Sequence, residues 1–140
     1  MDDHRAIQRL IALYAQLLDS GRLQDWGGLF AEEAEFRVSG STFLGRSEIV
    51  REIGGMQPDT PVKHVALPPV IDLLDAAHAR SWSDLCALST AGGTIQPATI
   101  GRYHDELVKD PEDGRWRFAR RVLVMGGEAV PDDVEPTPAW

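Results

Sequence analysis

The spacing of the apolar residues changes near Gln57, and this change constrains the fold more than any other feature of the sequence. Before it, the apolar positions of the N-terminal segment recur at helical spacing. They are Ile7, Leu10, Ile11, Tyr14, Leu17 and Leu18. This pattern predicts an amphipathic helix over residues 3–20 with one buried face. Asp2 or Asp3 can cap the start of this helix, and Gly21 can end it.

Two shorter helices and a hairpin are predicted before Gln57. The segment Leu23–Phe30 has an apolar face typical of a short helix. Alternating residues at 35–38 and 42–44 predict the two strands of a hairpin. A third helix is expected to begin at Ser47 and to end at a pair of glycines, Gly54-Gly55.

After Gln57 the chain continues in long extended runs. They lie at residues 62–74, 79–88, 94–108 and 115–125. The short turns between them favour an antiparallel sheet, and Pro68-Pro69 and Pro97 predict an edge position or a bulge where they interrupt two runs. Helices followed by successive strands indicate an α+β fold with the helices against one sheet face. We expect residues 1–125 to form one domain and residues 126–140 an irregular tail.

Charge and composition disfavour several functional classes. The formal net charge of −8 at pH 7 would repel nucleic acid. A cluster of three arginines is predicted to divide between strand faces, with Arg117 and Arg121 on one face and Arg120 on the other. No apolar run is long enough to span a bilayer, and the N-terminus lacks the pattern of a signal sequence. Together with a lone cysteine, Cys86, these features predict a cytoplasmic protein without nucleic-acid or membrane partners.

The motifs that bind common cofactors and metals are missing. The sequence has no phosphate-binding loop, no dinucleotide glycine fingerprint, no His-Glu-x-x-His motif and no paired cysteines. The four histidines, His4, His64, His78 and His104, are scattered along the chain. We therefore predict that the protein uses neither a cofactor nor a metal.

Asp19 and His64 are the residues best suited to acid–base chemistry, and each has two interpretations. Asp19 ends the apolar face of the first helix, where it either caps the next turn or orients a histidine. His64 lies near the start of the first long run, where it is either structural or a base that a carboxylate would orient. The residues alone leave both alternatives open.

Six short motifs point to a known family when they are taken in order. In the first half they are residues 5–10 leading to Leu18-Asp19, residues 29–36 and residues 45–49. In the second half they are Lys63-His64, residues 101–107 and residues 114–118. Over residues 4–125 the chain resembles the SnoaL-like branch of the nuclear-transport-factor-2-like superfamily. The resemblance implies a cone-shaped α+β barrel, in which N-terminal helices pack on a strongly curved, mostly antiparallel sheet that encloses a pocket.

The resemblance also implies a catalytic pair and a set of pocket residues. Within that superfamily the chain is similar to scytalone dehydratase and lindane dehydrochlorinase, in which a helix-end aspartate and a strand histidine form the pair. Asp19 and His64 match these positions, so His64 would remove a proton while Asp19 orients its ring. The matching substrate-binding residues are Tyr14, Phe36, Tyr103 and Arg121, and the alternative for each is a role in the core alone, since Tyr14 belongs to the apolar helix face and Phe36 to a strand face. Ser83 would join them if its strand face looks inward, whereas His104 is out of phase with Tyr103 on its strand.

These features predict a cofactor-independent lyase or isomerase, of dehydratase, elimination or cyclase type, acting on a small, mostly apolar cyclic or polyketide-like molecule. The alternative is a non-catalytic ligand-binding or accessory subunit of the same fold. An Asp19–His64 contact with the second ring nitrogen facing an enclosed cavity would favour the enzyme. The family also implies a homo-oligomer, a dimer or trimer, and apolar residues on the second sheet face, such as Trp82 and Val122, favour association there.

Overall fold

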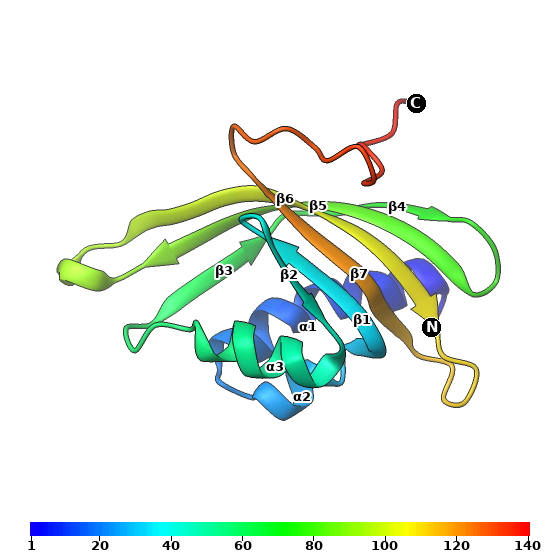
Figure 1. Ribbon diagram of the computed structural model, residues 1–140, viewed down its shortest axis with the longest axis horizontal. Coiled ribbons are helices and arrows are strands. Elements are labelled where there is room, and N and C mark those ends of the chain that lie inside the picture. Colours follow the sequence, from blue (N-terminus) through cyan, green and yellow to red (C-terminus); the bar gives the residue numbers. More distant parts are fainter.

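The computed structural model describes residues 1–140 (Figure 1). Its helices are α1 (Asp3–Asp19), α2 (Leu23–Gly27) and α3 (Arg46–Gly55), with one short 3-10 turn, η1, at Ala91–Gly93. Its strands are β1 (Phe30–Val38), β2 (Ser41–Leu44), β3 (Val62–Ala66), β4 (Val70–Leu73), β5 (His78–Ser89), β6 (Gln96–Lys109) and β7 (Trp116–Met125). None of the helices combines the length and the apolar character needed to cross a membrane.

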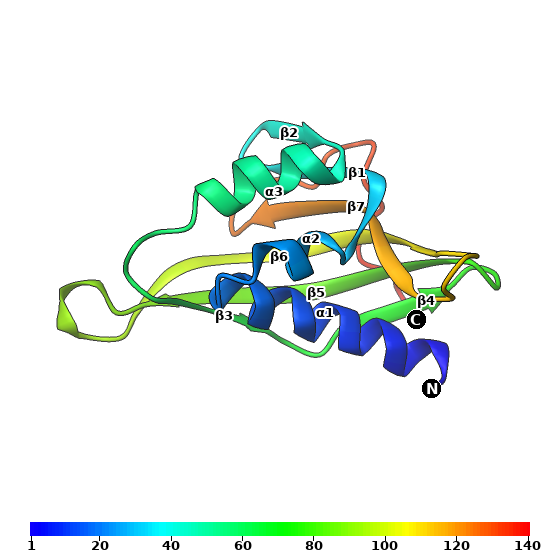
Figure 2. The same ribbon diagram turned by 90° about the horizontal axis from the view of Figure 1, so that it is seen from below.

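The strands form one seven-stranded sheet in the order β2-β1-β7-β6-β5-β3, and β4 also pairs with β5. Neighbouring strands run antiparallel except β1 and β7, which are parallel. The helices lie on one face of this curved sheet, called the inner face here. The C-terminal segment, which is the tail of residues 126–140, crosses the opposite, outer face (Figures 1 and 2). The predicted α+β fold, with helices on a mostly antiparallel sheet, is confirmed.

The apolar side of α1 packs on the inner face of the sheet. The side chain of Asp2 caps the helix by accepting a hydrogen bond from the backbone N–H of Arg5 at 2.9 Å. The helix ends where Gly21 adopts a φ of 68°, a conformation that glycine adopts without strain. The buried residues of α1 join aromatic residues of α2 and the sheet in one core. The aromatic members are Tyr14, Trp26, Phe30, Phe36, Tyr103, Trp116 and Phe118.

Prolines shape two of the long strands. Pro68 and Pro69 split the run predicted at 62–74 into β3 and β4, which pair with different parts of β5 at the sheet edge. Near Pro97 the register between β5 and β6 shifts, as expected for a bulge.

The second helix was predicted too long. It ends at Gly27, and Phe30 already belongs to β1.

The predicted division of the arginines was wrong. Ala119 is an extra residue in β7, between Phe118 and Arg120, where the register with β6 shifts. A bulge of this kind reverses the alternation of the side chains beyond it. As a result, Arg121 faces inward together with Phe118, while Arg117 and Arg120 form ion pairs outside the core.

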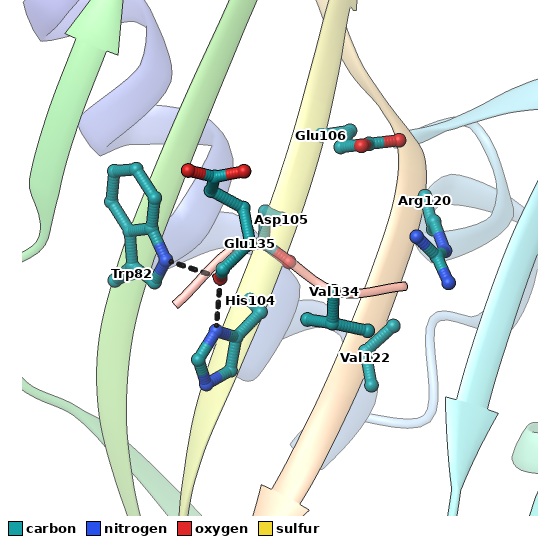
Figure 3. Close-up of a pocket in the computed structure, with 8 residues that line it drawn as sticks. All are labelled: Trp82, His104, Asp105, Glu106, Arg120, Val122, Val134 and Glu135. Carbon is teal, nitrogen blue, oxygen red and sulfur yellow. Dashed lines mark hydrogen bonds between the residues drawn. The ribbon is translucent and has the colours of Figure 1, made fainter. Parts of the chain in front are cut away.

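The C-terminal segment covers the middle of the outer face. Val134 packs against Val122, and the carbonyl of Glu135 accepts hydrogen bonds from Trp82 Nε1 at 3.1 Å and His104 Nδ1 at 2.9 Å (Figure 3). Trp82 and Val122 are therefore buried by their own chain. The expectation that these two residues are exposed for association was wrong, because the sequence pattern did not show where the tail lies.

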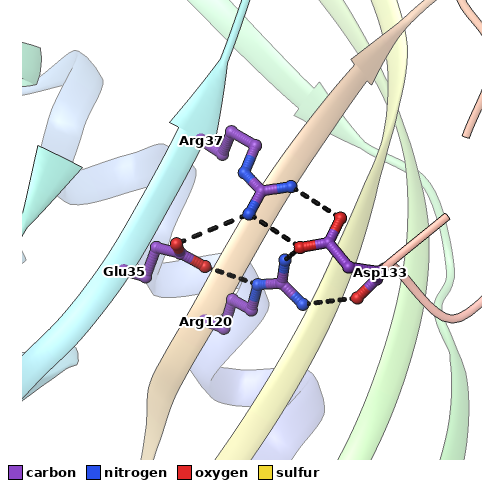
Figure 4. Close-up of polar contacts among 4 residues, drawn as sticks. All are labelled: Glu35, Arg37, Arg120 and Asp133. Carbon is purple, nitrogen blue, oxygen red and sulfur yellow. Dashed lines mark hydrogen bonds and ion pairs between the residues drawn. The ribbon is translucent and has the colours of Figure 1, made fainter. Parts of the chain in front are cut away.

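Asp133 anchors this segment to β1 and β7. Its carboxylate binds Arg37 Nη1 at 3.0 Å and Arg120 Nη2 at 2.7 Å, while Arg120 Nε also binds Glu35 at 2.5 Å (Figure 4). The hydrogen bond from Arg37, reinforced by Arg120, lowers the pKa of Asp133 to about 2. Charge pairing thus holds the segment on the sheet at neutral pH.

Candidate active site

The end of α1 brings Asp19 into contact with His64 on β3. The Oδ2 atom of Asp19 accepts a hydrogen bond from the backbone N–H of His64 at 2.8 Å. The Oδ1 atom contacts Nδ1 of the same imidazole ring. The side chains of Asp19 and His64 are only 8% and 15% exposed. One carboxylate therefore holds both the backbone and the ring of the histidine.

This contact decides which ring nitrogen of His64 can act as a base. An ionised carboxylate only accepts hydrogen bonds, so we assign the proton of neutral His64 to Nδ1. Nε2 then keeps its lone pair, has no hydrogen-bond partner, and is not among the fully enclosed polar atoms. His64 pairs with Ala87, whose side chain is buried. The imidazole therefore shares the inner face of the sheet.

A second polar group lies on the inner face across β5, β6 and β7. Arg121 donates from Nε and Nη2 to the two carboxylate oxygens of Asp105, at 2.8 and 3.1 Å. Ser81 donates to the same carboxylate at 3.1 Å, and all three side chains are buried. Burial, the largest single effect, disfavours the charge of Arg121, but the charge and hydrogen bonds of Asp105, together with Tyr103 and Tyr14, outweigh it and keep the pKa of Arg121 above its usual value.

Aromatic rings surround the guanidinium of Arg121. Its central carbon lies 3.7 Å from the ring centroid of Tyr103 and 4.2 Å from those of Tyr14 and Phe118. Burial raises the pKa of Tyr103, and it raises the pKa of Tyr14 well above its usual value. Both phenols are therefore protonated at neutral pH and can donate hydrogen bonds.

Tyr103 connects the two polar groups of the inner face. Its ring stacks against Arg121, and its side chain belongs to the same apolar core as Leu18, the residue before Asp19. Burial raises the pKa of its phenol, and the negative charges of Asp105 and Asp19 add to this effect. The Asp19–His64 pair and the Asp105–Arg121 pair therefore belong to one connected interior.

Three polar atoms of this interior are fully enclosed and have no hydrogen-bond partner. They are Arg121 Nη1, Ser83 Oγ and Trp26 Nε1. Leaving a buried polar group unpaired costs about 1 to 3 kcal/mol. Because Ser83 pairs with Tyr103 across β5 and β6, its free hydroxyl lies on the same wall as the ring that stacks on Arg121.

Every residue predicted to bind substrate is buried in this interior. These residues are Tyr14, Phe36, Ser83, Tyr103 and Arg121. Asp105 and Ser81 were not predicted as site residues, although each lies two residues from a predicted position on the same strand face, which was the available signal. His104 lies on the outer face beneath the tail, so it does not join Asp19 and His64.

Two surface hollows lie away from Asp19 and His64. A cleft of about 10 Å³ lies beneath the C-terminal segment, beside Trp82, His104 and Val134 (Figure 3). A groove of about 610 Å³ lies near the start of β1, with Glu32 and Arg46 in its wall. Aromatic rings fill the space between α1 and the sheet. No three His, Cys, Asp or Glu side chains gather in a way that could hold a metal ion.

Comparison with known sequences identifies the family. The sequence model of the SnoaL-like domain matches residues 1–122. The chain belongs to the SnoaL-like family. In this SnoaL-like protein the matched region contains both the Asp19–His64 pair and the Asp105–Arg121 pair. The comparison with curated proteins found no match.

Solved structures share the fold of this SnoaL-like protein. A putative scytalone dehydratase from Novosphingobium aromaticivorans is 23% identical with a TM-score of 0.75, over 97% of this chain and 93% of that one. A protein of unknown function from Mycobacterium tuberculosis is 25% identical with a TM-score of 0.77, over 86% and 69%. A protein from Catenulispora acidiphila, in complex with S-DNPA, is 22% identical with a TM-score of 0.76, over 86% and 91%.

Proposed function

We propose that this SnoaL-like protein is a cofactor-independent lyase or isomerase in which His64 is the general base and Asp19 orients it. The observation that carries the proposal is the double contact of Asp19 with His64, to its backbone N–H at 2.8 Å and to its Nδ1. This contact leaves Nε2 as the ring atom that can take a proton. An imidazole is an effective base near neutral pH when its tautomer and orientation are fixed.

The reaction would begin with transfer of a proton from a substrate carbon next to a carbonyl group to His64 Nε2. The electron pair of the broken C–H bond moves into the carbonyl group and gives an enolate. Asp19 stabilises the imidazolium that forms at the same time. The enolate then either expels a leaving group, which is an elimination, or regains the proton at another carbon, which is an isomerisation. Proton transfer by a positioned side chain contributes about 10²- to 10⁴-fold to a rate.

The proposed substrate is a small, mostly apolar cyclic molecule. Tyr14, Phe36 and Tyr103 would contact its rings, while Ser83 and Arg121 would bind its oxygen atoms. Two proteins of the same fold support a small-molecule function, because one is in complex with S-DNPA and another is described as a putative scytalone dehydratase. We further propose that the protein is a cytoplasmic homo-oligomer whose domain comprises residues 1–125.

A non-catalytic ligand-binding or accessory role is the second candidate. The packing of the interior favours it, because the ring of Tyr14 lies 5.6 Å from that of Tyr103 and 5.8 Å from that of Phe118. The cleft and the groove described above are also not lined by Asp19 or His64. In that case His64 would be structural, and its replacement would change stability without changing any reaction.

Proton–deuterium exchange tests the proposed base without the natural substrate. Acetophenone or tetralone is incubated with the protein in deuterium oxide, and the loss of the NMR signal of the protons next to the carbonyl is followed. The wild-type protein should accelerate this exchange, and His64→Ala should lose the acceleration. His78→Ala is a matched control, because His78 also contacts a carboxylate, that of Asp75 at 2.9 Å, but on the surface. Equal exchange in wild-type and folded His64→Ala protein would leave the binding role as the better explanation.

A further inference from the structure

One nitrogen of the Arg121 guanidinium, Nη1, makes no hydrogen bond within the protein. Asp105 takes up Nε and Nη2 through two hydrogen bonds, and Ser81 holds the same carboxylate in place. Nη1 is fully enclosed and unpaired. A guanidinium donor in an enclosed apolar environment binds an oxygen acceptor strongly when one is present. The unused donor therefore indicates a site for a ligand oxygen.

The charges around Arg121 limit which oxygen this site accepts. The single positive charge of Arg121 is already matched by the negative charge of Asp105, and both side chains are buried. A carboxylate ligand would add a second buried negative charge without a partner, which is costly in a medium of low dielectric constant. A neutral carbonyl oxygen adds no net charge and still accepts the hydrogen bond of Nη1.

We propose that the Ser81–Asp105–Arg121 group is the substrate-oxygen site, and that Asp105 makes it selective for a neutral carbonyl compound over a carboxylate. This inference deepens the proposed function and rests on it. When His64 removes a proton, the carbon–hydrogen electron pair moves onto the carbonyl oxygen, which becomes negative beside Arg121 Nη1. The hydrogen bond strengthens at that moment, so it favours the transition state more than the bound ketone. Asp105 and Ser81 are positioning residues, since they act through Arg121.

Three probes of similar size test the selectivity by binding alone. Acetophenone carries a neutral carbonyl group, ethylbenzene carries none, and benzoate carries a carboxylate. Each is titrated into the wild-type protein while the nitrogen NMR signals of the Arg121 side chain are followed. A hydrogen bond to a charged donor should make acetophenone bind about tenfold more tightly than ethylbenzene. Benzoate should bind more weakly than acetophenone, and only acetophenone should shift the Nη signals strongly.

Asp105→Asn separates a positioning role from a structural one. Removing the negative charge should reverse the order of benzoate and acetophenone, because Arg121 is then free to pair with a carboxylate. Loss of packing alone would weaken both ligands alike and keep their order. Asp84→Asn is the matched control, since Asp84 pairs with Arg102 at 2.6 Å in an exposed position, and it should leave the order unchanged. Should Asp105→Asn fail to fold, Ser81→Ala should reduce the preference for acetophenone while keeping the ion pair.

The result that overturns the inference is a wild-type protein that binds acetophenone no more tightly than ethylbenzene, or an order of ligands that Asp105→Asn leaves unchanged. Failure of the proposed catalysis looks different. Selective binding without proton–deuterium exchange would remove the general base and keep the oxygen site. Exchange that depends on His64, with no preference among the three probes, would keep the base and remove the oxygen site.

Discussion

Asp19 and His64 are 45 residues apart in sequence, yet the carboxylate of Asp19 binds both the backbone N–H and the imidazole of His64. The backbone bond fixes where β3 lies relative to the end of α1, and the side-chain bond fixes the ring. A carboxylate that only capped a turn would not need to make both contacts. Asp19 and His64 are therefore the pair of residues in this molecule best suited to acid–base chemistry.

If the two residues act as a unit, their replacements should not be additive. Asp19→Asn should lose a large part of the exchange or turnover activity, since the amide can present its N–H to the ring and favour the wrong tautomer. The double replacement with His64→Ala should be little worse than His64→Ala alone. Rates of the four proteins, with circular dichroism as a check of folding, provide the measurement. Strictly additive losses would assign independent roles to the two side chains.

Removal of the tail should expose an apolar surface. Val134 covers Val122, and Glu135 accepts the indole N–H of Trp82, so deletion of residues 129–140 uncovers both. We expect stronger self-association than in the full chain, measured by sedimentation, because exposed apolar patches promote association. Trp140→Ala is the control, since Trp140 is fully exposed and should not change the association. An unchanged sedimentation profile after the deletion would contradict the role given to the tail.

Docking of the tail should depend on pH through Asp133. Its pKa is lowered from 3.8 to about 2 by Arg37 and Arg120, so the folded state favours the ionised carboxyl. A lowered pKa means that this contribution is complete above about pH 4 and is lost as the pH falls toward 2. Methyl NMR signals of Val134 should report release of the tail over that range. Asp133→Asn should loosen the tail at every pH, whereas Asp132→Asn, at a neighbouring acid without such contacts, should behave like the wild type.

The helical spacing of the first eighteen residues was enough to predict α1 and the place of Asp19 at its end. The position of His64 on a strand followed from the extended pattern after Gln57, and the family resemblance supplied the pairing. Asp105 was missed because a charged residue inside a strand is normally read as exposed. Its ion pair with Arg121 and the hydrogen bond from Ser81, both formed with neighbouring strands, explain its burial.

Two features depended on interactions that no local pattern contains. The extra residue at Ala119 changes which side of β7 each later side chain faces, and it becomes visible only when β7 pairs with β6. The tail is polar and rich in proline, which indicates an irregular segment. Its location depends on Arg37 and Arg120, two residues that meet only when β1 and β7 lie side by side.

The close packing of β6 against β7 gives a prediction at Gly101. A Cβ atom there would lie 2.7 Å from the carbonyl oxygen of Val124 and 3.0 Å from a methyl group of Leu123. Because the first of these is a backbone atom that cannot turn away, Gly101→Ala should destabilise the protein by about 1 to 3 kcal/mol, the usual cost of overpacking. Gly55→Ala in α3 is the matched control, since a Cβ atom at Gly55 meets nothing within 4 Å. Alanine should there be neutral or stabilise the helix by up to about 1 kcal/mol. Urea unfolding of the two variants measures both effects, and a Gly101→Ala protein as stable as Gly55→Ala would show that the two strands can separate to admit a methyl group.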